Sequence, residues 1–104
     1  MIVEYIRYEV PSASRDKIVE AYRSAGQELA ASAQCLRYEI AQGVEEPGHF
    51  TVRIEWRSLE EHEKGFRGGA QFPAFFAKVK PFFDQIREMK HYQVVAGGPG
   101  GSAP

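Results

Sequence analysis

The chain has 104 residues, and its 13 Lys and Arg nearly balance its 14 Asp and Glu. This length predicts one domain. The net charge is near zero, so the chain lacks the excess of basic residues that is typical of proteins that bind nucleic acids or acidic membranes. No apolar run approaches the roughly 20 residues of a membrane span, and the first ten residues are already charged, so we predict a cytoplasmic protein without signal peptide or membrane anchor. Cys35 is the only cysteine, which excludes an internal disulfide and a thiolate metal cluster within one chain.

The first two predicted elements are a strand and a helix. Residues 2–10 alternate between apolar and charged side chains, which is typical of a half-buried strand. Glu4 is the exception, since it falls on the apolar side with Ile6 and Tyr8. Pro11 ends this strand, and apolar residues from Ile18 onward recur at helical spacing to about residue 32.

Three copies of an Arg-x-Glu motif mark three strands, at residues 7–9, 37–39 and 53–55. Because strand side chains alternate between faces, each copy places Arg and Glu on one face and the middle residue on the other. If the second and third copies pair as an antiparallel hairpin, opposite charges face one another and the turn centres on Glu46. The sequence at this point, Val-Glu-Glu-Pro-Gly, suits a turn.

The second half of the chain predicts a broken helical region and a last strand. Ser58 and Glu61 form a capping box, and the short helix behind it carries Leu59, His62 and Phe66 on one face. Two glycines at residues 68–69 end this helix. A Phe-rich helix then begins at Phe72-Pro73, Pro81 should kink or restart it, and a strand should follow over about residues 88–95. The side chains predicted to face inward from this region are Phe72, Phe75, Phe76, Val79, Phe83 and Ile86.

The predicted order is β-α-β-β-α-β, a ferredoxin-like α+β fold with an antiparallel sheet in the order 4-1-3-2 and helices on one face. The first and third strands are then neighbours, and we expect Arg7 opposite Glu55 and Glu9 opposite Arg53. We predict one domain over residues 1–95, followed by a disordered tail over 96–104, which consists of Gly, Pro, Ala and Ser.

Several segments resemble the antibiotic biosynthesis monooxygenase family. They are the opening residues 5–11, the strand that ends in Trp56 with the capping box behind it, and the helix that begins Phe-Pro-Ala-Phe-Phe. The resemblance covers about residues 2–95. It implies a dimeric α+β barrel and a homodimer, and it implies a small enzyme that oxygenates aromatic compounds with O2 and without metal or flavin. Other members degrade haem.

Two positions depart from the haem-degrading pattern. Where those members have an Asn and an iron-binding His, this chain has Ile6 and Phe66, and only Trp56 remains. His62 lies one helical turn before Phe66, so a shifted haem ligand is geometrically conceivable.

The resemblance places a substrate pocket between the apolar side of the sheet and the helices. Its predicted lining is Ile6, Tyr8, Tyr38, Trp56, Phe66, Phe72 and Phe76, although helix-spaced aromatic residues are more often plain core. Trp56 should orient a substrate, because a buried indole N–H needs a hydrogen-bond partner. His62 should act as general base, or be a core histidine bonded to backbone. The facing of His91 is ambiguous, and the three histidines lack metal-ligand spacing along the chain.

These observations lead to one hypothesis and two alternatives. The first is a homodimeric, cofactor-independent monooxygenase that acts on an electron-rich aromatic or quinone-like compound. The alternatives are a non-catalytic dimeric binding or regulatory domain and, less favoured, a haem-binding or haem-degrading protein. The charged sheet face should meet the second subunit through Arg7, Glu9, Arg37, Glu39, Arg53 and Glu55.

Overall fold

The computed structural model describes residues 1–102. Its elements in chain order are β1 (Ile2–Glu9), α1 (Arg15–Ala31), β2 (Cys35–Gln42), β3 (His49–Trp56), a π-helical segment (Glu61–Phe66), α2 (Phe72–Val79), a 3-10 segment (Lys80–Gln85) and β4 (Ile86–Gln93). A short 3-10 turn, Ser12–Ser14, leads into α1. The predicted sequence of strands and helices is therefore confirmed, and the last strand begins and ends two residues earlier than expected.

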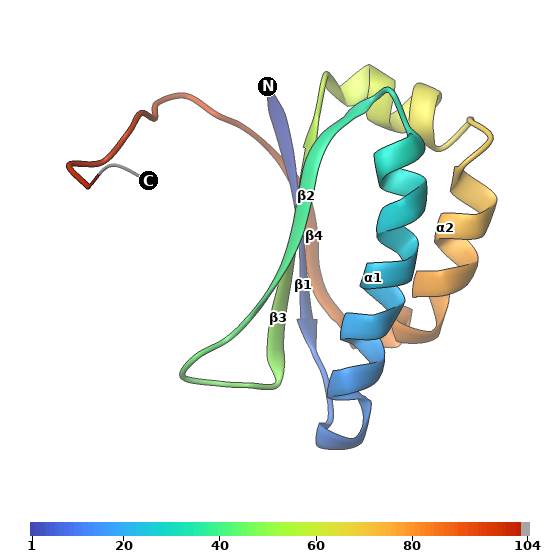
Figure 1. The fold of residues 1–104 in the computed structure, drawn as a ribbon, viewed down its shortest axis with the longest axis vertical. Coiled ribbons are helices and arrows are strands. Elements are labelled where there is room, and N and C mark those ends of the chain that lie inside the picture. The colour runs from blue at the N-terminus through green and yellow to red at the C-terminus, as the bar shows by residue number, and fades with distance from the viewer. Residues whose placement is uncertain (103–104) are drawn as a thin grey trace.

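The four strands form one antiparallel sheet in the order β2-β3-β1-β4. Figure 1 shows α1 and α2 side by side on one face of this sheet, while the other face carries no helix. The predicted ferredoxin-like fold and strand order are confirmed. Residues 96–102 are exposed, form no helix or strand, and lead away from β4 on the helix-free side. The last two residues of the predicted tail, 103–104, lie outside the described residues.

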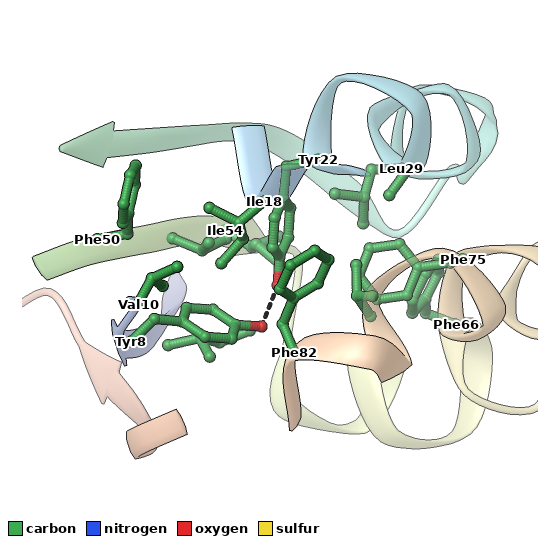
Figure 2. Packing of buried hydrophobic residues seen from close by; sticks show 14 of the residues in the cluster. Tyr8, Val10, Ile18, Tyr22, Leu29, Phe50, Ile54, Phe66, Phe75 and Phe82 are labelled. Carbon is green, nitrogen blue, oxygen red and sulfur yellow. Dashed lines mark hydrogen bonds between the residues drawn. The ribbon is translucent and has the colours of Figure 1, made fainter. Parts of the chain in front are cut away.

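The hydrophobic core fills the space between the helices and the sheet, as Figure 2 shows. Helix α1 contributes Ile18, Tyr22, Ala25 and Leu29, which recur at the helical spacing predicted from Ile18 onward. Strand β3 contributes Phe50, Val52, Ile54 and Trp56, each only 1% exposed. The alternation of the strand and the period of the helix therefore turned the expected faces toward one another.

The two strand registers predicted from the Arg-x-Glu motifs had different outcomes. In the β2–β3 hairpin Arg37 lies opposite Glu55 and Glu39 opposite Arg53, as predicted. Between β1 and β3 the prediction was wrong, because Arg7 lies opposite Thr51 and Glu9 opposite His49. A shift of four residues keeps every side chain on the same face, so alternation alone could not distinguish the two registers.

The helical region after β3 departs from a regular α-helix. One of the two bonds of the predicted capping box is present, with the Glu61 backbone N–H donating to Ser58 Oγ at 3.0 Å. The Arg67 N–H then donates to the carbonyl of His62 at 3.1 Å, an i→i+5 bond that widens the turn. In this wider turn His62 and Phe66 both point inward, whereas Leu59, predicted on the same face, is 42% exposed.

Pro81 restarts the last helical region as a 3-10 segment, as its missing N–H predicted. The tighter 3-10 turn rotates the following side chains relative to an α-helix. Phe82 therefore packs in the core, where Phe83 was expected, and Phe83 is 41% exposed.

Candidate functional site

A cavity of about 340 Å³ lies between the sheet and the helical region that follows β3. Its wall is mostly aromatic and aliphatic, with side chains from β1, β3 and β4 of the sheet, helices α1 and α2, and the π-helical and 3-10 segments. The residues that line it are Glu4, Ile6, Tyr8, Tyr22, Ile54, Trp56, His62, Phe66, Arg67, Phe72, Phe75, Phe76, Val79, Phe83, Ile86 and Met89. A cavity of this size and composition can enclose a small planar molecule.

A cluster of four side chains, Glu4, Trp56, His62 and His91, forms one polar region at this cavity, and the first three of them line its wall. The Trp56 indole N–H donates to Glu4 Oε1 at 3.1 Å, and the indole stacks on the His62 ring with centroids 4.2 Å apart. His62 Nε2 lies 3.5 Å from Glu4 Oε1. His62 Nδ1 lies 2.7 Å from His91 Nε2, within hydrogen-bond distance. Trp56, Glu4 and His62 are each at most 3% exposed.

The sheet registers explain how this cluster forms. Glu4 lies directly opposite His91 across the β1–β4 pair and opposite Ile54 across the β1–β3 pair. Directly opposed residues share a face, so Glu4 and His91 both point toward the helices. The π-helical segment then places His62 over this pair, and π-helical turns are frequent at functional sites.

The electrostatics of the cluster favour proton exchange. Burial raises the pKa of the Glu4 carboxyl above its ordinary value, opposed by the hydrogen bond from Trp56 and by the charges of His91 and Arg67. Burial, with the charges of His91 and Arg67, lowers the pKa of His62 to about 3. His62 is therefore a neutral imidazole at neutral pH, and Glu4 is the group whose proton affinity is enhanced.

A second polar pair belongs to the same cavity. The hydroxyl oxygens of Tyr8 and Tyr22 lie 2.6 Å apart, and both residues are buried, as Figure 2 shows. Burial raises the pKa of Tyr8 to about 12 and that of Tyr22 further, so both are neutral phenols. The pair holds two hydroxyl hydrogens and its internal bond uses one. Within residues 1–102 neither hydroxyl has another hydrogen-bond partner, so the second hydrogen is free for a ligand oxygen.

Most residues predicted to line a pocket lie on the cavity wall. Ile6, Tyr8, Phe66, Phe72 and Phe76 all line it, as do Trp56 and His62. Tyr38 does not, because its strand is at the sheet edge and its ring, in a residue 41% exposed, lies against Gly26 of α1. Tyr38 is thus removed from the candidate site.

Two predicted hydrogen-bonding roles differ from what the structure holds. The indole N–H of Trp56 was expected to donate to a bound substrate, but it donates to Glu4. His62 bonds to another side chain, His91, where backbone was the expected partner of a core histidine.

Sequence reasoning missed Glu4, Tyr22 and Arg67 as site residues, and it left the facing of His91 open. One signal was present: Glu4 is a charged residue on the apolar side of its strand, which is unusual unless the charge is paired. The sequence does not show which face of its strand His91 occupies. Met89, two residues away, shares its face and Tyr92, next to it, lies on the other face, and neither residue is polar enough to mark its face as the exposed one.

One family model matches most of the chain. The model of the antibiotic biosynthesis monooxygenase family matches residues 1–78. YczJ of Bacillus subtilis (strain 168), an uncharacterised protein, is 22% identical over 95 residues, which cover 91% of this chain and all of that protein.

Solved structures share the fold. A Bordetella bronchiseptica protein assigned to the antibiotic biosynthesis monooxygenases superposes with a TM-score of 0.78 at 20% identity, over 91% of this chain and 97% of that one. The cofactor-independent oxygenase SnoaB from Streptomyces nogalater, solved as a mutant, gives a TM-score of 0.79 at 10% identity, over 95% and 97% of the two chains. Within residues 1–102, none of the helices has the length and apolar character needed to cross a membrane.

Proposed function

Because this chain belongs to the antibiotic biosynthesis monooxygenase family, we propose that it oxygenates an electron-rich planar aromatic or quinol-like compound with O2, without a bound cofactor. The observation that carries the proposal is Glu4, a carboxyl with a raised pKa at the wall of an apolar cavity, hydrogen-bonded to Trp56. A general base works best when its pKa lies near the working pH, and burial moves Glu4 in that direction.

The proposed reaction converts a ring CH2 group flanked by phenolic rings into a carbonyl. Glu4 removes a proton, which leaves a carbanion stabilised as a phenolate. This anion transfers one electron to O2, and the resulting radical and superoxide combine to form a peroxide anion. The peroxide anion takes back the proton held by Glu4 and becomes a hydroperoxide. Loss of water from the peroxide leaves C=O, so one CH2 and one O2 become one C=O and one H2O. The apolar wall keeps bulk water from the intermediates.

The residues predicted as catalytic take revised roles in this proposal. Glu4 replaces His62 as the base, because a neutral imidazole with a pKa of about 3 is a poor proton acceptor. His62 relays the proton between Glu4 and His91, which is partly exposed. Trp56 is a positioning residue, since it holds the Glu4 carboxylate by its N–H and the His62 ring by stacking.

The Tyr8–Tyr22 pair orients the substrate in this proposal. Its spare hydroxyl hydrogen suits a carbonyl or phenolic oxygen. A substrate with an oxygen at one end and an acidic C–H or O–H at the other would therefore use both polar parts of the cavity. The phenylalanines between them would stack on its rings.

The test is O2 consumption with a panel of anthrones and reduced quinones. Glu4→Gln preserves the size and a hydrogen-bond acceptor but removes the base, so we expect turnover to fall by about 10²-fold or more. Glu20→Gln, a carboxylate change on the exposed side of α1, is the matched control and should retain wild-type turnover. Equal rates for Glu4→Gln and wild type would contradict the proposal. Saturable ligand binding without O2 uptake by the wild type would favour the binding-domain alternative.

A further inference from the structure

We propose that Glu4, His62 and His91 form a binding site for one divalent transition-metal ion of the Zn²⁺, Co²⁺ or Cu²⁺ class. The ligand atoms of these three side chains all lie within 4.8 Å of one another. The proposal concerns metal binding alone and does not rest on the oxygenation proposed above.

The donor atoms lie close enough to converge on one ion. His62 Nδ1 lies 2.7 Å from His91 Nε2, and His91 Nε2 lies 4.0 Å from Glu4 Oε2. One ion binds only one ring nitrogen of His62, and with one donor atom taken from each residue the three atoms lie within 4.8 Å of one another. Metal–ligand bonds of about 2.0–2.2 Å place neighbouring donors in a tetrahedral or octahedral site about 3.0–3.5 Å apart. Small side-chain rotations would bring the three donors to those separations.

The charges in the cluster also favour a cation. Glu4 is 3% exposed and contacts two imidazoles, and neither is a permanent positive charge. A buried carboxylate without a cation is costly, and a metal ion would supply the missing charge. Arg67 opposes the ion to some extent, but its side chain is exposed at the cavity wall, where solvent screens it.

The surroundings of the cluster resemble a metal-binding shell. The Trp56 N–H holds one carboxylate oxygen of Glu4, and its indole fixes the plane of the His62 ring. Such outer contacts orient metal ligands and raise affinity. Two of the three ligands stand on adjacent strands, β1 and β4, so the backbone beneath the site is rigid.

The donor set indicates the class of metal. Two imidazole nitrogens and one carboxylate oxygen suit Zn²⁺ and the neighbouring first-row ions better than Mg²⁺ or Ca²⁺, which prefer all-oxygen ligands. Three protein ligands leave a coordination position for water or a ligand oxygen. Because Glu4 and His62 line the cavity, this position can open into it.

Metal binding and proton transfer would use the same lone pairs of Glu4 and His62. An ion in the site would therefore block the relay, and Zn²⁺ should inhibit oxygenation where that activity is present.

The experiment is metal titration of chelator-treated protein in the absence of any substrate. Co²⁺ is followed by visible absorption and Zn²⁺ by calorimetry, and we expect one ion per chain. His91→Ala and Glu4→Gln should each weaken binding at least tenfold. Trp56→Phe, which keeps an aromatic ring but removes the N–H, should weaken it less than the loss of a ligand does.

His49→Ala is the matched control, because His49 also contacts two carboxylates, Glu9 and Glu46, but lies on the surface. Its affinity should equal that of the wild type. Circular dichroism melting checks that each variant is folded. If a ligand variant does not fold, the metal affinity of Trp56→Phe is compared with that of the wild type instead. The proposal is overturned if the wild type shows no saturable binding, or if His49→Ala weakens binding as much as His91→Ala.

Discussion

Glu4 occupies a position that its strand would ordinarily give to an aliphatic side chain. Its neighbours on the same face of β1 are Ile6 and Tyr8, both buried. A buried carboxyl costs free energy unless it is hydrogen-bonded. The two oxygens of Glu4 can accept several hydrogen bonds, and Trp56 donates one of them. A valine would pack there at lower cost, so the carboxyl is better explained by chemistry than by stability.

His62 makes a prediction on pH dependence. Its pKa is about 3 in the folded protein against an ordinary value of 6.5, so the unfolded chain binds more protons between these values. Stability from this group is complete above pH 6.5 and is lost as the pH falls toward 3. The loss is about 1.4 kcal/mol per pH unit at its steepest.

The measurement is urea unfolding of wild type and His62→Phe from about pH 7.5 to about pH 5. We expect the wild type to lose about 2 kcal/mol relative to the variant over this range. If the difference in the free energy of unfolding between the wild type and His62→Phe stays constant with pH, His62 titrates in the folded state as it does in the unfolded chain.

Among the elements, the edge strand β2 depends on a small residue in α1. A Cβ added at Gly26 would lie 2.3 Å from the Tyr38 hydroxyl oxygen and 2.7 Å from the adjoining ring carbon. Gly26 is therefore kept in the middle of a helix, where Ala would be favoured by about 1 kcal/mol, so that the Tyr38 ring can pack.

This contact predicts non-additive effects on stability. Gly26→Ala alone should destabilise the fold by about 1–3 kcal/mol, because the Tyr38 ring must move. In a Tyr38→Ser background the same change meets no ring, and helix propensity should then make it stabilising by up to about 1 kcal/mol. Chemical denaturation of the four proteins measures the coupling. Additive effects would mean that Tyr38 and Gly26 do not pack in solution.

Local rules predicted the elements better than the contacts between distant elements. The hairpin register followed from the turn and the paired charges of the Arg37 and Arg53 motifs, which are close in the chain. The β1–β3 register depends on core packing between segments far apart in the chain, and strand alternation leaves an even shift undetermined. The same limit hid the Glu4–His91 pair, and the widened turn at His62 has no simple sequence signal.

At the scale of the molecule, one face of the sheet carries no helix and is open to a binding partner. All six residues predicted for the interface lie on this face, as their alternation required. At its centre Tyr5 and Tyr92 pack edge to face with centroids 5.4 Å apart, and Arg53 donates to the Tyr5 hydroxyl at 3.3 Å. Aromatic residues and arginine are the side chains enriched in protein interfaces.

We therefore predict that two copies pack through this face, so that light scattering during gel filtration gives about twice the chain mass of 11.7 kDa. Tyr92→Glu should shift the protein to monomer, because Tyr92 is 43% exposed in one chain and the new carboxylate would lie beside Glu88. Arg23→Glu on the exposed side of α1 should leave the mass unchanged. A wild type that runs as a monomer at about 100 µM would place the charged side chains of this face in solvent, where such ion pairs contribute little and serve chiefly to set the strand register.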